Sequence, residues 1–280
     1  RNSPIPCKIQ LGKELTAGHG AGNNPAMGEK SAQESLADIE AILKKDTRMA
    51  FITAAMGGGT GTGAAPVIAR LSKDMGILTV GIVSVPARFE GPKRLDQARD
   101  GLRRLKDHVD CLIVIDNEKI KSIYGSQTIS QAFAKANDVL NIAAKGIAEI
   151  ITLPGYINVD FADVRTVMTD SGVAIMGAAQ ASGEDRAIRA ITEALESPLL
   201  NNNDILGAKD ILLNITSGTD EITMDEMSQI TSHIIRKVGN NAAVIWGVGT
   251  DPDLGDAVSV TIIATGFPTG DIELFGEENT

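Results

Sequence analysis

The chain has 280 residues and a net charge of −10 at pH 7, from 26 basic and 36 acidic side chains. This acidic balance argues against nucleic acid as the main partner, because a phosphate backbone is bound by a basic face. Hydrophobic residues make up 43% of the chain, which allows a substantial core in one large domain or two modest ones. No apolar run is long enough to span a membrane, so direct membrane insertion is not expected.

The cysteines and histidines limit the chemistry further. Cys7 and Cys111 each lie in a strand-like apolar run, and we expect both to be buried free thiols in a reducing compartment. The histidines are scattered and there is no CxxC pair, so the sequence predicts no zinc site. No signal peptide is recognisable in the sequence.

Strands alternate with helices through the first part of the chain. The predicted elements are a strand over 5–10, a glycine-rich loop over 11–28, a helix over 31–44, a strand over 49–53, a helix over 64–74, a strand over 77–83, a helix over 93–107 and a strand over 110–115. The last strand is apolar throughout, which is typical of a parallel sheet that is buried on both faces. The alternation predicts an α/β, Rossmann-like parallel sheet whose ligands bind at the carboxyl ends of the strands.

A long helical segment follows. Residues 130–153 predict a helix in two pieces, with a break near Asn137 and Asp138 and a stop at Pro154. The second piece is apolar over a wide arc, so we expect a central helix that packs between two bodies.

The second half predicts a smaller α+β domain with a mixed sheet. Its predicted elements are a helix over 161–168, a strand over 173–176, a helix over 184–195, a strand over 210–215, a helix over 223–238 and strands over 243–248 and 257–264. The last helix begins with Thr223 and has Glu226 three residues later, which is capping-box spacing. The last two strands are joined by a short segment, so we expect them to form an antiparallel pair.

Residues 57–63 consist of five glycines and two threonines, between a predicted strand and a predicted helix. Glycines let a backbone approach a ligand closely, and a helix N-terminus offers unpaired N–H groups, so this unit predicts a phosphate cradle. The alternative is a tight turn without a ligand, which seven such residues in a row disfavour. The segment contains no P-loop lysine. Gly59-x-Gly61-x-x-Ala64 fits a dinucleotide pattern, but the next strand lacks an acidic residue at its end.

Two further groups of polar residues are candidates for nucleotide contacts. Glu90 and Arg94 follow a strand and could meet a ribose and a phosphate, or form a surface ion pair at i,i+4 spacing. Phe133 could stack on a base, and the Asp138 carboxylate could accept from the paired donors of guanine, with Asn137 beside it. The alternative for Asn137 and Asp138 is a cap at a helix break.

A last group comprises Asn158, Asp160 and Asp163. Its carboxylates could position a water and a cation, or simply form the acidic first turn of a helix. The loop follows a helix of about 15 residues, over 20 Å long, that starts near the proposed base site. These carboxylates are therefore expected to reach a nucleotide only in a neighbouring molecule.

Together these motifs resemble one family. The stretches Gly57-Gly-Gly-Thr-Gly-Thr-Gly63, Phe89-Glu-Gly91, Ala136-Asn-Asp-Val-Leu140 and Asn158-Val-Asp-Phe-Ala-Asp-Val-Arg165 resemble those of FtsZ, the bacterial cell-division GTPase family related to tubulin. The resemblance covers about residues 5–267. It implies GTP and GDP as ligands, Mg²⁺ as the ion, and head-to-tail protofilaments that form the division ring in the cytoplasm at mid-cell.

The resemblance also assigns roles to individual positions. Gly59, Thr60 and Gly61 would lie nearest the phosphates, and the segment Gly20-Ala-Gly-Asn23 would lie by the γ-phosphate. The nucleotide-binding residues that it implies are Gly20, Ala21, Gly22, Gly57, Gly58, Gly59, Thr60, Gly61, Thr62, Gly63, Glu90, Arg94, Asn117, Phe133, Asn137 and Asp138. Asn158, Asp160 and Asp163 would be the hydrolytic loop, which orients water at the nucleotide of the next subunit.

The domains follow from the same resemblance. They are a GTP-binding domain over 1–136, a connecting helix over 137–155, a C-terminal α+β domain over 156–267 and the start of a tail over 268–280. The family's first strand, first glycine loop and first helix are expected upstream of Arg1. A flexible tail that recruits membrane tethers and division regulators is expected after Thr280.

Two alternatives to a polymerising GTPase remain open at this point. One is a nucleotide-binding filament or structural subunit with little turnover, which the presence of Asp160 and Asp163 disfavours. The other is a dinucleotide-dependent oxidoreductase, which rests on the Gly59-x-Gly61-x-x-Ala64 pattern alone.

Overall fold

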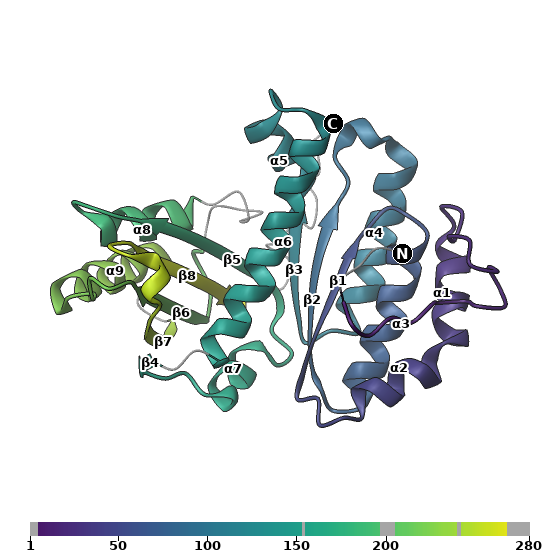
Figure 1. The fold of residues 1–280 in the computed structure, drawn as a ribbon, viewed down its shortest axis with the longest axis horizontal. Helices are drawn as coiled ribbons and strands as arrows, with labels where there is room; N and C mark the ends of the chain where they lie inside the picture. The colour runs from purple at the N-terminus through teal and green to yellow at the C-terminus, as the bar shows by residue number, and fades with distance from the viewer. Residues whose placement is uncertain (1–4, 153–154, 197–204, 240–241, 268–280) are drawn as a thin grey trace. The chain divides into compact units, whose positions relative to one another are not determined.

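The structure is a computed structural model, and it describes residues 5–152, 155–196, 205–239 and 242–267. The chain forms two compact units, Arg1–Asp110 and Cys111–Thr280 (Figure 1). The predicted domain boundaries stay a prediction, and the predicted start of a tail over 268–280 lies outside the described residues.

The first unit is built on two parallel strands with helices packed against them. Its elements are α1 (Pro25–Glu34), α2 (Leu36–Leu43), β1 (Met49–Ala55), α3 (Thr60–Asp74), β2 (Leu78–Val85), the 3₁₀ turn η1 (Arg88–Glu90) and α4 (Pro92–Lys106). β1 pairs with β2 in parallel from Met49↔Leu78 to Ala55↔Ser84. Every residue of β2 is buried, which is typical of a parallel strand that is covered on both faces.

Helix α3 lies at the centre of this unit and contacts α1, α2, α4 and both strands. The backbones of α3 and α1 are in direct contact. A Cβ atom on Gly28 would lie 2.2 Å from the Gly59 carbonyl oxygen, and one on Gly63 would lie 2.0 Å from the Pro25 carbonyl oxygen. The two glycines therefore allow a helix contact that a larger residue would prevent.

The second unit is a mixed sheet with helices on both faces. Its elements are β3 (Cys111–Asp116), α5 (Asn117–Tyr124), α6 (Ile129–Thr152), β4 (Gly155–Ile157), α7 (Phe161–Met168), β5 (Gly172–Ala181), α8 (Arg186–Leu195), β6 (Asp210–Ser217), α9 (Met224–Val238), β7 (Ala243–Thr250), the 3₁₀ turn η2 (Pro252–Leu254) and β8 (Val258–Thr265). Within it the strand order is β3-β5-β8-β6-β7-β4. Parallel pairs β3–β5 and β6–β7 occur beside antiparallel pairs, so the predicted mixed sheet is confirmed.

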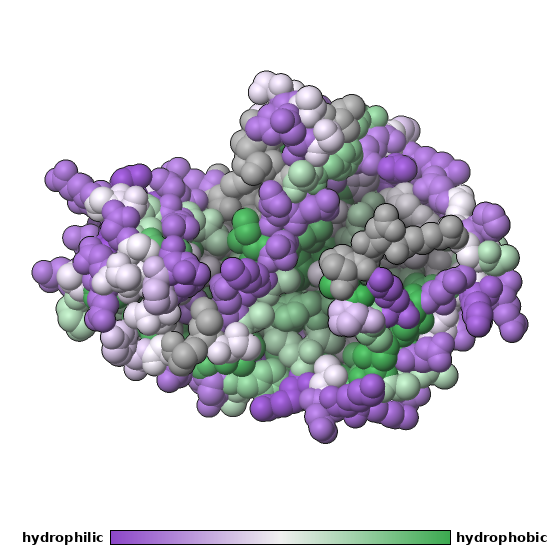
Figure 2. Space-filling view, viewed as in Figure 1, coloured by the Kyte–Doolittle hydropathy of each residue, from purple (hydrophilic) through white to green (hydrophobic). Residues whose placement is uncertain are grey.

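Different helices cover the two faces of this sheet. Ile175 of β5 belongs to a buried cluster with Ile191 of α8 and Ile230 of α9. The next residue of β5, Met176, points the other way and approaches Gly146 of α6, since successive side chains of a strand alternate between its faces. Figure 2 shows mainly hydrophilic side chains over the region where Figure 1 places α8 and α9, so these helices turn their apolar faces to the sheet.

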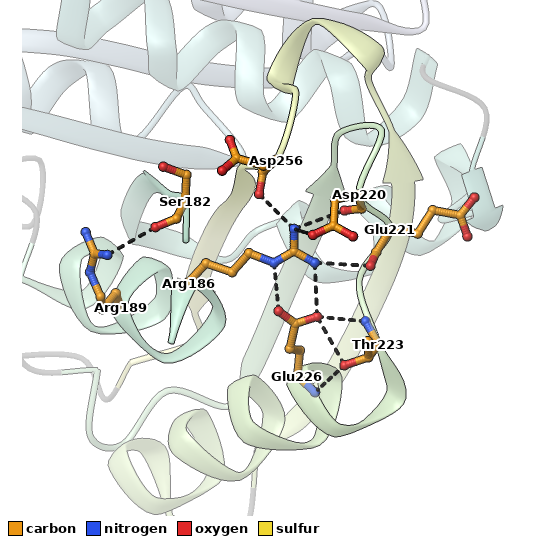
Figure 3. Close-up of polar contacts among 8 residues, drawn as sticks. All are labelled: Ser182, Arg186, Arg189, Asp220, Glu221, Thr223, Glu226 and Asp256. Atoms are coloured by element: carbon orange, nitrogen blue, oxygen red, sulfur yellow. Dashed lines mark hydrogen bonds and ion pairs between the residues drawn. The ribbon is translucent and has the colours of Figure 1, made fainter. Parts of the chain in front are cut away.

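A buried arginine joins the loops at one end of this sheet (Figure 3). Arg186 is 5% exposed. Its Nε and Nη2 donate to the two carboxylate oxygens of Glu226, at 2.7 and 3.2 Å. Its Nη1 donates to Asp220 Oδ2 at 2.9 Å and to the Asp256 carbonyl at 2.7 Å, and Nη2 donates to the Glu221 carbonyl at 3.1 Å. These five residues, the Arg186 cluster, tie α8 to the start of α9 and to the turn before β8.

Several sequence predictions for the first 44 residues are wrong. In the described part of the chain, residues 5–10 form no strand, and Cys7 is exposed, whereas Cys111 is buried as predicted. Pro6 lacks the N–H group that a strand ladder requires. The predicted helix over 31–44 is two helices, α1 and α2, with Ser35 between them.

The predicted pair of the last two strands is also wrong. β7 pairs with β6 and β4, and β8 lies between β5 and β6. The short connection through η2 therefore joins two strands that are not neighbours. The helix prediction over 130–153 fails differently, because α6 is a single helix of 24 residues without a break near Asn137. Residues 153 and 154, where a stop was predicted, lie outside the described residues.

Among the residues that the structure describes, no helix combines the length and the hydropathy that a membrane crossing requires.

Candidate functional site

The glycine loop, residues 57–63, turns the chain from β1 into α3. Gly57 has a left-handed backbone with φ +94°, which favours glycine. Its N–H donates to the Thr62 hydroxyl at 2.9 Å, so a buried side chain of the helix holds the loop closed. The predicted order of strand, glycine loop and helix is confirmed, with the helix starting at Thr60 instead of 64.

The start of α3 leaves backbone donors unpaired within the helix. Gly59 is the N-cap residue and makes no side-chain capping bond. The N–H of Gly63 donates to the Gly59 carbonyl at 3.1 Å. The N–H groups of residues 60–62 precede that bond and have no partner in the helix, and they lie at the positive end of its dipole. Such a terminus suits a phosphate group.

The glycines of the loop serve two different purposes. Packing requires three of them, because an added Cβ would lie 2.7 Å from the Asn24 nitrogen at Gly59, 2.3 Å from the Ala55 oxygen at Gly61 and 2.0 Å from the Pro25 oxygen at Gly63. An added Cβ at Gly58 would meet no atom within 4 Å. Gly58 is therefore the position where the absence of a side chain leaves room for a ligand. The turn without a ligand, the alternative that the sequence left open, accounts for only part of the loop.

The predicted γ-phosphate segment, residues 20–23, lies against the glycine loop. Gly59 is so close to Ala21 that an added Cβ would lie 2.8 Å from the Ala21 Cβ. Gly22 and Asn23 both have left-handed backbones, with φ +59° and +58°. The next residue, Asn24, caps α1 by accepting from the Ala26 N–H at 3.0 Å. The structure thus brings two of the predicted segments together.

Glu90 and Arg94 lie at the same end of the first unit. An added Cβ on Gly57 would lie 2.9 Å from the Arg94 carbonyl oxygen, which places the start of α4 beside the loop. Arg94 Nη1 donates to Glu90 Oε2 at 2.8 Å, and Glu90 Oε1 accepts from the Ala87 N–H at 3.1 Å. The ion pair that the spacing allowed is therefore present. Glu90 is mostly buried, whereas the Arg94 side chain is half exposed.

Two side chains of α4 contact the two loops, Gln97 the segment over residues 20–23 and Arg104 the glycine loop. Gln97 Nε2 donates to the Asn23 carbonyl at 3.1 Å. Arg104 donates to the Thr62 carbonyl at 3.4 Å and to Glu29 Oε2 at 2.7 Å. The sequence predictions missed Gln97 and Arg104. Their helical spacing, with Gly101 between them on the same face, is the only local signal that could have pointed to them.

The predicted base-binding residues lie in the second unit. Phe133, Asn137 and Asp138 are exposed on α6, with Phe133 and Asn137 one turn apart on one face. Both Asn137 and Asp138 are inside the helix, so their alternative role as a cap at a helix break is wrong. Asn117 is the first residue of α5, which packs against α6. Its Oδ1 is buried and has no hydrogen-bond partner among the described residues.

The acidic loop, which comprises Asn158, Asp160 and Asp163, connects β4 to the first turn of α7. Hydrogen bonds from its own side chains order it. Asn158 Oδ1 accepts from the Gly155 N–H at 2.8 Å. Asp160 is the N-cap of α7, and its Oδ1 accepts from the Asp163 N–H at 2.9 Å, while Asp163 Oδ2 accepts from the Asp160 N–H at 3.0 Å. The capping role is confirmed, and the second oxygen of each carboxylate takes no part in it.

The acidic loop is far from the base-binding candidates along α6. The helix has 24 residues, and more than half of it, about 20 Å, separates Asp138 from the last residue, Thr152. Within the described residues, no group of three or more His, Cys, Asp or Glu side chains is arranged to hold a metal ion. Asp160 and Asp163 could therefore contribute to an ion site only together with ligands from elsewhere.

Comparisons with known proteins identify the family of the chain. Residues 1–125 match the model of the Tubulin/FtsZ family, GTPase domain, and residues 172–268 match the model of the FtsZ family, C-terminal domain. The chain is 48% identical over 267 residues to the cell division protein FtsZ of Porphyromonas gingivalis, an alignment that covers 95% of this chain and 58% of that protein. It is 48% identical over 270 residues to FtsZ of Buchnera aphidicola, covering 96% of this chain and 70% of that protein.

A solved structure has the same fold. A structure described as an empty FtsZ dimer from M. jannaschii superimposes with a TM-score of 0.85 at 44% identity, over 91% of this chain and 74% of that one. The chain spans about 58% of the length of the Porphyromonas relative. The Rossmann-like, tubulin-related architecture predicted from the motifs is confirmed, and the chain belongs to the FtsZ family.

Proposed function

We propose that this protein binds and hydrolyses GTP and polymerises head to tail into protofilaments of the bacterial division ring at mid-cell. The observation that carries the proposal is the glycine loop, with N–H groups that lack helix partners at the start of α3 and open space beside Gly58. The family supports the nucleotide, since the matched model over residues 1–125 is that of a GTPase domain. The solved relative described as a dimer supports self-association.

In this proposal the residues divide the work. Residues 57–63 bind the phosphates through backbone N–H groups, and residues 20–23 contact the γ-phosphate. Glu90 and Arg94 serve the ribose and phosphate side. Phe133 stacks on guanine, and Asp138 accepts from its N1–H and N2–H groups, with Asn137 and Asn117 as further contacts. The unpaired acceptor of Asn117 is the kind of group that a base donor would satisfy.

Asn158, Asp160 and Asp163 orient the attacking water in the proposed mechanism. They act on the nucleotide of the next subunit, because α6 separates them from the base-binding residues of their own chain. The second oxygen of each carboxylate is available to accept from water while the other oxygen fixes the loop. Mg²⁺, held mainly by phosphate oxygens, would neutralise charge that develops on the phosphates.

The domain roles are part of the same proposal. Residues 1–136 bind GTP, residues 137–155 connect this domain to the next, and residues 156–267 form the C-terminal domain, which carries the acidic loop. Residues 268–280 begin a tail through which tethers and regulators bind. A filament subunit with little turnover is the alternative.

The test is the rate of GTP hydrolysis per molecule as a function of protein concentration, for the parent and for Asp160→Ala. We expect a specific activity near zero in dilute solution and a steep rise with concentration. Asp160→Ala should bind GTP without turnover. Glu193→Ala, which removes an exposed carboxylate of α8, is the matched control and should behave like the parent.

Other outcomes would separate the alternatives. A specific activity that does not depend on concentration would place the acidic loop and the nucleotide in the same molecule. GTP binding without turnover at any concentration would favour the filament subunit. Binding of NAD(H) in place of GTP would favour the oxidoreductase.

A further inference from the structure

One face of α4 holds both of the loops that are proposed to bind phosphates. Gln97, Gly101 and Arg104 share this face, at helical spacing. Gly101 allows the closest approach, since an added Cβ would lie 2.5 Å from the Thr62 Cγ2. Arg104 donates to the carbonyl of the same threonine. Packing against Gly101 and the hydrogen bond from the Arg104 guanidinium therefore fix the side of the glycine loop that faces α4.

Gln97 contacts the other loop, and its amide is only half satisfied. Nε2 donates to the Asn23 carbonyl at 3.1 Å. Oε1 is buried and has no hydrogen-bond partner in the described part of the chain. A buried acceptor without a partner destabilises the folded state, so an amide at this position is a poor choice for stability alone. What the amide provides is the bond to Asn23.

That bond acts on a segment that needs to be held in place. Gly22 and Asn23 are both in the left-handed region, which an asparagine tolerates less easily than a glycine. Open space surrounds Gly20 and Gly22, where an added Cβ would meet nothing within 4 Å. The segment is held by its contact with Gly59 on one side and by Gln97 on the other.

We propose that Gln97 is a positioning residue that sets the preference of this site for a nucleoside triphosphate over a diphosphate. It fixes residues 20–23 against the glycine loop, so that their backbone is pre-arranged for a terminal phosphate. This inference rests on the proposed function, in which residues 20–23 contact the γ-phosphate. Gln97 donates to the loop, and in this proposal it acts on the nucleotide through that loop.

The experiment compares affinity with stability in Gln97→Met. Methionine keeps the length of the side chain and removes both the donor and the unpaired acceptor. Equilibrium binding would be measured for a non-hydrolysable GTP analogue and for GDP, together with thermal unfolding without nucleotide. We expect the affinity for the triphosphate to fall roughly three- to tenfold, the effect of one lost hydrogen bond, while the affinity for GDP stays within about twofold.

The unfolding temperature of Gln97→Met should stay unchanged or rise, because the buried acceptor is gone. A role in stability alone would give the opposite pattern, with a lower unfolding temperature and unchanged affinities. Gln97→Glu keeps an acceptor but turns a carboxylate oxygen toward the Asn23 carbonyl. We expect it to lose more triphosphate affinity than the methionine variant.

Gln33→Met is the matched control, since it changes an exposed glutamine of α1 in the same unit. It should leave both affinities unchanged. Equal losses for the two nucleotides in Gln97→Met, or no loss for either, would overturn the proposal and leave the proposed function standing. A parent protein that binds neither nucleotide would overturn both.

Discussion

The glycine loop and the Arg186 cluster are both dense polar regions, but they treat hydrogen-bonding groups in opposite ways. The guanidinium of Arg186 donates to the carboxylates of Glu226 and Asp220 and to three backbone carbonyls, all in the same unit. The glycine loop leaves the N–H groups of residues 60–62 without helix partners and leaves open space at Gly58. A region whose groups are satisfied internally contributes stability, and one that leaves donors unpaired is suited to a ligand.

The largest effect that this comparison predicts is on stability, in Arg186→Met. The change leaves the Glu226 carboxylate without its cation. It also removes the hydrogen bonds that join α8 to the loop before α9 and to the turn before β8. We expect the free energy of unfolding to fall by about 3 to 5 kcal/mol, as for other buried pairs that lose one partner. Denaturant unfolding measures this directly.

Arg189→Met is the control for that variant, because Arg189 lies on the same helix but is exposed, and its side chain donates to the Ser182 carbonyl (Figure 3). Its unfolding free energy should change by about 0.5 kcal/mol or less. If Arg186→Met and Arg189→Met were equally stable, the cluster would not be the structural tie described above.

The second largest predicted effect is a loss of stability at low pH, because acid protonates a carboxylate of the Arg186 cluster. The hydrogen bond from Arg186 lowers the pKa of Glu226 from 4.5 to about 2. A carboxyl group with a lowered folded-state pKa stabilises the fold fully above its unfolded pKa, and loses that contribution as the pH falls from about 4.5 to about 2. Unfolding measured across this range should lose about 2 kcal/mol from this group, less than the full shift would give, because solvent screens a partly exposed carboxylate.

In Glu226→Gln this part of the pH dependence should disappear, because the amide does not titrate. An unchanged acid profile in that variant would assign the loss of stability to other carboxylates.

Two glycines of the loop should respond differently to the same change. Gly63→Ala forces a methyl group against the Pro25 oxygen and the Glu29 nitrogen, both backbone atoms. We expect a loss of about 1 to 3 kcal/mol in unfolding free energy. Gly58→Ala has room for its methyl group and should change stability by about 0.5 kcal/mol or less. Equal losses in the two variants would remove the distinction between packed and open positions.

The smallest of the predicted losses of stability that should be measurable concerns a helix cap beside the Arg186 cluster. Thr223 accepts from the Glu226 N–H at 3.2 Å and caps α9. Thr223→Ala should cost about 1 kcal/mol, and Thr223→Ser should restore most of it, because serine keeps the hydroxyl. Chemical denaturation of the three proteins would show whether the cap acts on its own.

What the sequence predicted well was local. The capping signals at Asp160 and Thr223 involve residues three positions apart, and both helices begin where these signals place them. The glycine loop was recognisable because strand, loop and helix are consecutive. The signals for these elements lie within a few residues, so their structure depends little on the rest of the fold.

The features that the sequence predicted poorly depend on partners far along the chain. The insertion of β8 between β5 and β6 pairs strands that no local pattern links. The contact of Gln97 with Asn23 spans 74 positions. The continuity of α6 through Asn137 and Asp138 overrides the preference of both residues for helix ends, since a helix that packs along its length tolerates weak helix formers.

The most direct test of the account is the affinity of Gly58→Ala for GTP. The methyl group occupies the open position of the loop, so we expect the affinity to fall at least about tenfold, with the protein as stable as the parent. Equilibrium binding and thermal unfolding on the same preparation measure both quantities. GTP binding that is unchanged in a stable Gly58→Ala variant would contradict the assignment of the glycine loop as the phosphate site.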